Sequence, residues 1–250
     1  MSLRIGVFDS GVGGLTVLKE LVKTVPAEYV YIGDSLRAPY GNRSRDELLS
    51  FMKELVTFLR EKECDVFVNA CNSLSSLDTE KLLHDLNISG EKYIDMVSVT
   101  KKHVNDFPED ARILLYATEA TIATGVYQDV FKARTITAYA SALLAGAVET
   151  GHQIIIDEEI DALLDMVIRE KITHVFLGCT HYPLIEEYLE KRFAGLSVQF
   201  INPAVYVPEG IVGKQQGLAS VNLYTTKMNE GWTTYSALFP DAVLEEIKLE

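Results

Sequence analysis

Two of the three cysteines in this chain lie in settings that could support chemistry. Cys71 lies in the stretch DVFVNACNS and Cys179 in THVFLGCTH, and each stretch reads as an apolar strand, a small residue, a cysteine and two polar residues. Cys64 has no such setting and is expected to pack. A free cysteine is usually a buried packing residue, so one such stretch would mean little. Two cysteines at equivalent turns favour a functional role.

Three kinds of chemistry could use these thiols. Zinc sites need closely spaced ligand pairs; Cys64 and Cys71 are too far apart and Cys179 and His181 too close, so no metal is expected. A nucleophilic hydrolase would use one cysteine and leave the other without a role. An acid–base pair uses both, because one thiolate removes a proton from a carbon and the opposing thiol protonates the other face. That reaction inverts a stereocentre.

A glycine-rich loop, DSGVGG, follows the first expected strand and opens a helix. It matches neither the dinucleotide-binding fingerprint nor the P-loop. The Asp9 carboxylate would suit an ammonium group, and the helix amides beyond Ser10 would suit a carboxylate. The alternative is that Asp9 only caps a tight turn.

Further polar residues could complete a site. In GDSLRAPYG, Tyr40 and the Gly41 amide could hold a small ligand, or they could form an ordinary turn. His181 could stabilise a thiolate at Cys179, or it could be a capping residue. Glu149 ends the helix-like run AYASALLAGAVET, where it could equally be an exposed terminal residue.

Composition restricts the class of protein. The net charge of −13, without any cluster of Lys or Arg, argues against nucleic-acid binding. No apolar run approaches the ~18 residues of a membrane span, so no membrane association is expected. Sparse cysteines in odd number, without a secretory signal, predict a reducing cytoplasmic location.

Short apolar runs alternate with helical patterns along the chain. Such alternation predicts an α/β fold with mainly parallel sheets, whose ligands bind at the carboxyl ends of the strands. Helical periodicity marks residues 15–22 and 47–60. The expected strands are residues 3–8, 29–32, 66–70, 93–99, 113–117, 174–178 and 198–201.

The similarity of the two cysteine stretches predicts two similar α/β domains, the second beginning near residue 97. The tail from Val221 is expected to form a strand, a helix and a final strand that return to the first domain. The predicted boundaries are 1–96 plus 206–250 for the first domain and 97–205 for the second. The active site is expected in the cleft between them.

Four stretches, FDSGVGGLTV, GDSLRAPYG, NACNS and LGCTHYPL, resemble the signature motifs of bacterial glutamate racemase in the same order, and the resemblance runs over the whole chain. It implies a cofactor-independent racemase of glutamate with two pseudo-symmetric domains. Cys71 and Cys179 would be the acid–base catalysts, Asp9 would assist Cys71, and Glu149 and His181 would assist Cys179. The residues expected to contact substrate are Asp9, Ser10, Tyr40, Gly41, Asn72, Ser73, Thr118, Thr121, Thr180 and His181. The family supplies D-glutamate for peptidoglycan, and its members usually form homodimers.

The chain departs from the family pattern beside one cysteine. Ser73 replaces the usual threonine and keeps the hydroxyl, whereas Leu74 replaces the usual alanine and, being bulkier, could narrow or reshape the pocket. Two alternatives to glutamate racemisation therefore stay open. One is a racemase of aspartate or another small acidic amino acid. The other is a racemase-like ligand-binding or regulatory protein with little turnover.

Overall fold

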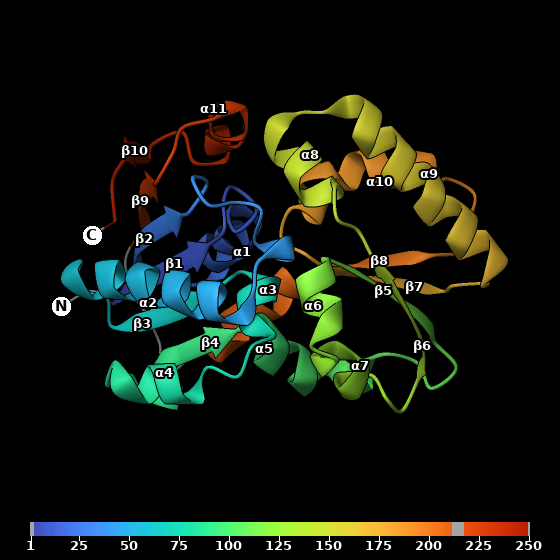
Figure 1. Ribbon diagram of the computed structural model, residues 1–250, viewed down its shortest axis with the longest axis horizontal. Coiled ribbons are helices and arrows are strands. Elements are labelled where there is room, and N and C mark those ends of the chain that lie inside the picture. Colours follow the sequence, from blue (N-terminus) through green and yellow to red (C-terminus); the bar gives the residue numbers. More distant parts are fainter. Residues whose placement is uncertain (1–2, 212–217, 250) are drawn as a thin grey trace.

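Two parallel β-sheets lie in separate halves of the computed structural model, which describes residues 3–211 and 218–249 (Figure 1). The large sheet has the strand order β10-β9-β2-β1-β3-β4, and the small sheet has the order β6-β5-β7-β8. Every described strand pair is parallel. The predicted α/β class is confirmed.

Each sheet has its own strands and helices, and the two parts are called the large-sheet half and the small-sheet half below. The large-sheet half contains β1 (Arg4–Asp9), α1 (Leu15–Thr24), β2 (Glu28–Gly33), α2 (Arg45–Glu61), β3 (Val66–Asn69), α3 (Asn72–Ser75), α4 (Glu80–Asp85), β4 (Tyr93–Asp95), α5 (Met96–His103), β9 (Ser220–Thr225), α11 (Glu230–Tyr235) and β10 (Val243–Glu246). The small-sheet half contains β5 (Arg112–Ala117), α6 (Glu119–Ala123), α7 (Val126–Val130), β6 (Thr135–Ala140), α8 (Leu144–Thr150), α9 (Gln153–Arg169), β7 (His174–Gly178), α10 (Glu186–Arg192) and β8 (Gln199–Ile201). Short 3₁₀ helices include η1 (Tyr40–Asn42), η4 (Tyr182–Ile185) and η5 (Pro203–Gly210).

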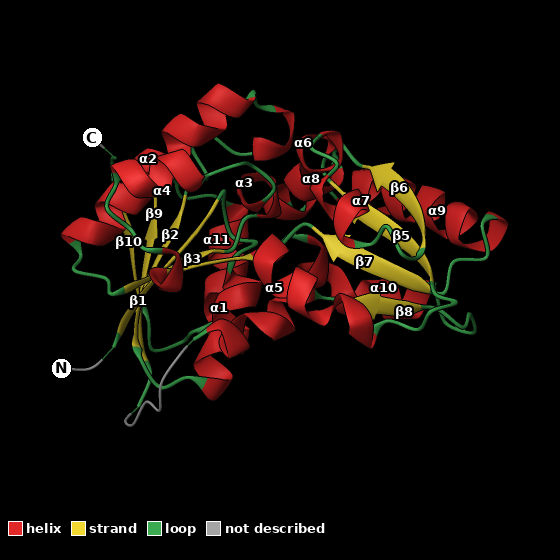
Figure 2. Ribbon diagram, turned by 90° about the horizontal axis from the view of Figure 1, so that it is seen from below, coloured by secondary structure: helices red, strands yellow, loops and turns green. Residues whose placement is uncertain are grey.

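Helices cover both faces of each sheet, as Figure 2 shows for α1 and α2 on the large sheet. Successive strand side chains point to opposite faces. In β1, Ile5 and Val7 therefore join the core beneath α1, while Phe8 joins the core beneath α2. No described helix has the length and apolar character needed to cross a membrane.

Local capping explains one error in the predicted strands. The run 93–99 was expected to be a single strand, but β4 ends at Asp95 and α5 begins at the next residue. Asp95 Oδ1 accepts a hydrogen bond from Ser98 N at 2.8 Å, and the Asp95 backbone N–H donates one to Ser98 Oγ, which completes a capping box. This reciprocal cap favours the helix over continued strand pairing.

The tail folds as its pattern predicts, with a strand, a helix and a strand. β9 pairs with β2, and β10 pairs with β9, so the tail completes the large sheet. Strand β6 was not predicted, because its sequence TITAYA is half exposed and carries no continuous apolar run.

Candidate active site

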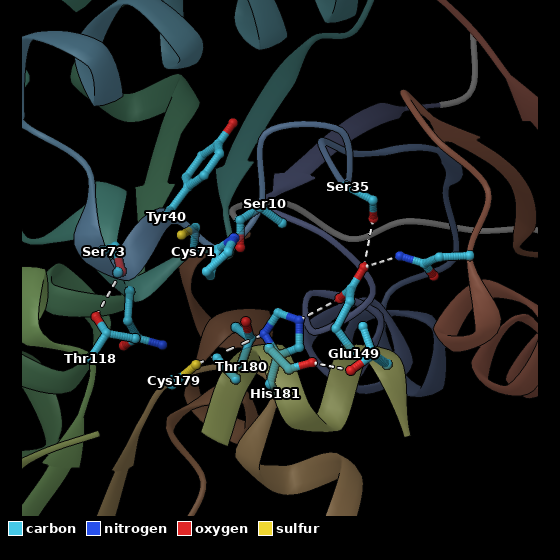
Figure 3. Close-up of a pocket in the computed structure, with 18 of the residues that line it drawn as sticks. Ser10, Ser35, Tyr40, Cys71, Ser73, Thr118, Glu149, Cys179, Thr180 and His181 are labelled. Atoms are coloured by element: carbon cyan, nitrogen blue, oxygen red, sulfur yellow. Dashed lines mark hydrogen bonds and ion pairs between the residues drawn. The ribbon is translucent and has the colours of Figure 1, made fainter. Parts of the chain in front are cut away.

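The two cysteines occupy equivalent positions in the two halves. Cys179 directly follows β7 of the small sheet, and Cys71 follows β3 of the large sheet after one alanine. Cys71 is 4% exposed and Cys179 is 6% exposed, and both line the same cavity (Figure 3). Strand ends of two different sheets thus bring two sulfurs to one enclosed space.

The cavity has a volume of about 200 Å³. The cavity is lined by all the residues expected at the site except Asp9 and Thr121. These two lie behind lining residues: Asp9 is hydrogen-bonded to Thr180, and Thr121 to Ser73 and Thr118. Residues that the sequence did not single out also line the cavity: Ser35, Ala38, Pro39, Ala145, Gly146, Thr150, Lys227 and Asn229. Among the described residues, no group of three or more His, Cys, Asp and Glu side chains could hold a metal ion.

Asp9 ends β1 and is fully buried. Its Oδ1 accepts from Gly11 N at 3.1 Å, and its Oδ2 accepts from Thr180 Oγ1 at 3.0 Å. Burial raises the pKa of Asp9, while the charge of His181 acts to lower it. Burial, together with the Asp9 charge, also raises the pKa of Cys71 above its ordinary value. Cys71 is therefore held as a neutral thiol at neutral pH.

The Cys179 side contains a buried ion pair. His181 Nε2 lies 2.6 Å from Glu149 Oε2, and His181 Nδ1 lies 3.9 Å from Cys179 Sγ. Burial acts to lower the pKa of His181, but the contacts with Cys179 and Glu149 outweigh it and raise that pKa well above its ordinary value. Burial opposes ionisation of Glu149 too, yet its hydrogen bonds, led by His181, lower its pKa to about 2. An imidazolium beside a sulfur favours the thiolate.

Hydroxyl groups gather beside Cys71. Ser73 Oγ lies 3.0 Å from Thr118 Oγ1 and 3.4 Å from Thr121 Oγ1. Asn72 Oδ1 accepts from the Tyr127 hydroxyl at 2.5 Å, whereas the buried Asn72 Nδ2 has no partner among the described residues. A buried donor without a partner is costly, so this amide is suited to bind an anionic ligand group.

The structure adds detail on Tyr40 and corrects the expectation about Leu74. The Tyr40 hydroxyl donates to Asp34 and points away from the cavity (Figure 3), so the Tyr40 hydroxyl is not free to bind a ligand there. Leu74 is fully buried in the core beneath α2 and does not line the cavity. The expectation that Leu74 narrows the pocket is wrong, because the first turn of α3 directs its side chain into that core.

Two missed residues, Ser35 and Asn229, touch Glu149. Ser35 Oγ donates to Glu149 Oε1 at 2.7 Å, and Asn229 Nδ2 donates to the same oxygen at 2.8 Å. Ser35 lies in the quoted stretch GDSLRAPYG and could have been included. Asn229 lies in the tail, where nothing in the sequence connects it to Glu149.

Comparison with known proteins agrees with this geometry. No protein-family model matches the chain. The curated glutamate racemase 3 of Caldanaerobacter subterraneus subsp. tengcongensis is 32% identical over 245 residues, which cover 91% of this chain and 87% of that protein. The glutamate racemase of Aquifex aeolicus is 32% identical, covering 91% and 90% of the two chains. The crystal structure of a glutamate racemase isoform from Bacillus anthracis superposes with a TM-score of 0.84 at 26% identity, covering 99% and 98%.

These similarities define the class of protein as an amino-acid racemase, an isomerase. Within that class, the chain belongs to the glutamate racemase family.

Proposed function

We propose that this protein interconverts L- and D-glutamate by proton transfer between the substrate α-carbon and two thiols, without a cofactor. One observation carries the proposal: Cys71 and Cys179 reach a single cavity from two different sheets. Direct racemisation by two groups uses a base on one side of the α-carbon and an acid on the other. A pair of sulfurs contributed by opposing halves meets that requirement.

In this proposal, one cysteine acts as a thiolate and the other as a thiol, and their roles exchange with the direction of reaction. Ionising an ordinary thiol at pH 7 costs about 2 kcal/mol. On the Cys179 side, the imidazolium of His181, held by Glu149, offsets that cost. On the Cys71 side, the buried Asp9 carboxylate behind the cavity would attract the substrate ammonium through its charge, and the positive charge of that ammonium would offset the burial of Cys71.

The remaining polar groups would bind the substrate. The free Asn72 amide donor and the hydroxyls of Ser73 and Thr118 would bind carboxylate oxygens, with Thr121 orienting Thr118. The Thr180 hydroxyl, which donates to Asp9, would accept a hydrogen bond from the substrate ammonium. Ser10, Tyr40 and Gly41 also line the cavity and would contact the substrate. Donors fixed in an enclosed cavity stabilise the charge that develops as the α-proton leaves.

We further propose the wider setting that the family suggests. The chain would divide into residues 1–96 plus 206–250 and residues 97–205, because β9 and β10 add to the large sheet while β5–β8 form the small one. It would act as a cytoplasmic homodimer that supplies D-glutamate for peptidoglycan. Sizing by light scattering tests the dimer.

Hydrogen exchange in D₂O tests the reaction. L- and D-glutamate, and separately L- and D-aspartate, are incubated with the protein, and loss of the α-proton is followed by NMR. We expect both enantiomers of glutamate to exchange, and Cys71→Ser or Cys179→Ser to lower racemisation about 10³-fold. Cys64→Ser is the matched control, because Cys64 packs in the core beneath α2 and should leave the rate unchanged.

The other outcomes select among the alternatives. Glutamate exchange that survives in the Cys71→Ser, Cys179→Ser double variant contradicts the two-thiol mechanism. Exchange of aspartate alone identifies an aspartate racemase. Binding of glutamate without exchange in the wild-type protein identifies a ligand-binding protein.

A further inference from the structure

Each carboxylate beside a cysteine is held by donors from the opposite half of the molecule. Asp9, on β1 of the large sheet, accepts from Thr180, which follows β7 of the small sheet, at 3.0 Å. Glu149, on α8 of the small-sheet half, accepts from three donors of the large-sheet half. These donors are Val12 N at 3.1 Å, Ser35 Oγ at 2.7 Å and Asn229 Nδ2 at 2.8 Å.

The Glu149 carboxylate has donors on both oxygens. Oε1 receives Ser35 and Asn229, and Oε2 receives Val12 N and His181. The side chain is nearly inaccessible, so solvent does not replace a lost donor easily. A buried carboxylate that lacks such donors would favour the protonated form.

Ser35 and Asn229 are themselves fixed by one core residue. Trp232 is fully buried, and its Nε1 donates to Ser35 Oγ at 2.9 Å. Its backbone N–H donates to Asn229 Oδ1 at 3.1 Å, which caps α11. The two donors therefore reach Glu149 from a rigid support rather than from mobile side chains.

We propose that Ser35 and Asn229 are positioning residues that hold Glu149 across the cleft, so that the Glu149–His181 pair is set beside Cys179 only when the two halves are closed. This inference rests on the proposed function, in which Cys179 is one of the two acid–base groups. Separation of the halves, which admits substrate, removes three of the four donors to Glu149. Closure restores them together with the Asp9–Thr180 contact.

Other ionisable groups face this pair. Cys179 adjoins His181, and the charge of Asp9 interacts with both His181 and Glu149. The Tyr31 and Tyr235 hydroxyls also lie within electrostatic range of Glu149.

Lys227 lines the same cavity, and Glu230 lies near the end of α8 at Gly151. None of these groups donates a hydrogen bond to Glu149 among the described residues, so Ser35 and Asn229 keep their distinct role.

The test removes each donor and retains its structural contacts where the chain allows. Asn229→Ser deletes the amide donor but keeps a side-chain cap for α11. Ser35→Ala deletes the hydroxyl, and Ser35→Thr restores it. Trp232→Phe removes the indole donor to Ser35 but leaves the Ser35 hydroxyl in place, so it tests the contribution of that support alone.

We expect Ser35→Ala and Asn229→Ser each to lower kcat about tenfold with little change in KM, since each removes a hydrogen bond to a charged group. The acid limb of the kcat profile should move to higher pH, because loss of a donor raises the pKa of Glu149. Ser35→Thr should restore the wild-type profile. The equilibrium constant between enantiomers is one, so kcat/KM must fall equally in both directions.

A second readout does not depend on turnover. The protein is produced with glutamate residues that carry ¹³C at the side-chain carboxyl, and NMR then follows the titration of Glu149. The Glu149 signal is assigned by its absence in Glu149→Gln. Glu149 should titrate at higher pH in Ser35→Ala and Asn229→Ser and at its wild-type position in Ser35→Thr. In Trp232→Phe, which keeps the Ser35 hydroxyl but loses its support, the shift should be smaller than in Ser35→Ala.

An unchanged Glu149 titration in both donor variants overturns the inference. If the titration moves but the wild-type protein exchanges no amino-acid α-proton, the holding of Glu149 stands and the proposed function fails.

Discussion

His181 and Glu149 form a buried ion pair whose Nε2 and Oε2 atoms lie 2.6 Å apart. His181 also contacts Cys179, so the pair lies next to one of the two thiols. Glu149 also accepts a hydrogen bond from Ser35, so the pair connects the small-sheet half with the large-sheet half. Its pKa values therefore affect stability as well as catalysis.

Acid stability should depend on Glu149. Its pKa of about 2 lies below the ordinary 4.5, so its stabilisation is complete above 4.5 and is lost as the pH falls toward 2. The full effect is on the order of 3 kcal/mol. Urea unfolding measured from about pH 5 to about pH 3 should show a steeper loss of unfolding free energy in the wild-type protein than in Glu149→Gln. Equal slopes would count against the ion pair.

Alkaline stability should depend on His181 in the opposite sense. Its pKa is raised on folding, so its stabilisation is complete below the ordinary 6.5 and is lost as the pH rises through the raised value. His181→Asn removes this dependence while keeping a polar side chain. Thermal unfolding between about pH 7 and about pH 10 measures it. A wild-type midpoint that does not fall relative to the variant would show that the imidazolium is absent.

The two thiols should differ in reactivity. Burial raises the pKa of Cys71, whereas Cys179 has an imidazolium beside it. Iodoacetamide at neutral pH should label Cys179 at least about tenfold faster than Cys71, since thiolate is the reactive form. His181→Asn should reduce that preference. Peptide mass spectrometry measures both rates, and preferential labelling of Cys71 would contradict the assigned electrostatics.

The close approach of the halves should make Gly11 intolerant of a side chain. A Cβ there would lie 2.5 Å from Glu149 Oε2, so either the carboxylate or the loop must move. Gly11→Ala should lower kcat about 10²-fold, as expected when a positioned group is displaced by about 1 Å. Gly90→Ala is the control, because a Cβ at Gly90 meets no atom within 4 Å. Steady-state racemisation by circular dichroism compares the two.

The hydroxyl cluster should control substrate affinity. Ser73→Ala removes one proposed donor to the substrate and one partner of Thr118, so KM for glutamate should rise about tenfold. Ser73→Thr keeps the hydroxyl and should stay near the wild-type KM. If alanine and threonine behave alike, the hydroxyl does not contact substrate.

Strand ends were predictable, and contacts between distant segments were not. The position of Cys71 and Cys179 after β3 and β7 follows from local patterning, because apolar runs and turn residues are local signals. The link between Asn229 and Glu149 joins residues far apart in sequence, and no periodicity encodes such a contact. Leu74 was misplaced for a related reason: the direction of its side chain is set by the first turn of α3.

The tail of the large sheet has a consequence for protein synthesis. β9 supplies the neighbour of β2, and Asn229 follows it to reach Glu149. While residues 220–246 are still inside the ribosome, β2 has an unpaired edge and Glu149 lacks the hydrogen bond from Asn229. A newly made polypeptide therefore cannot complete the large sheet or the hydrogen bonds of Glu149 until these residues have emerged.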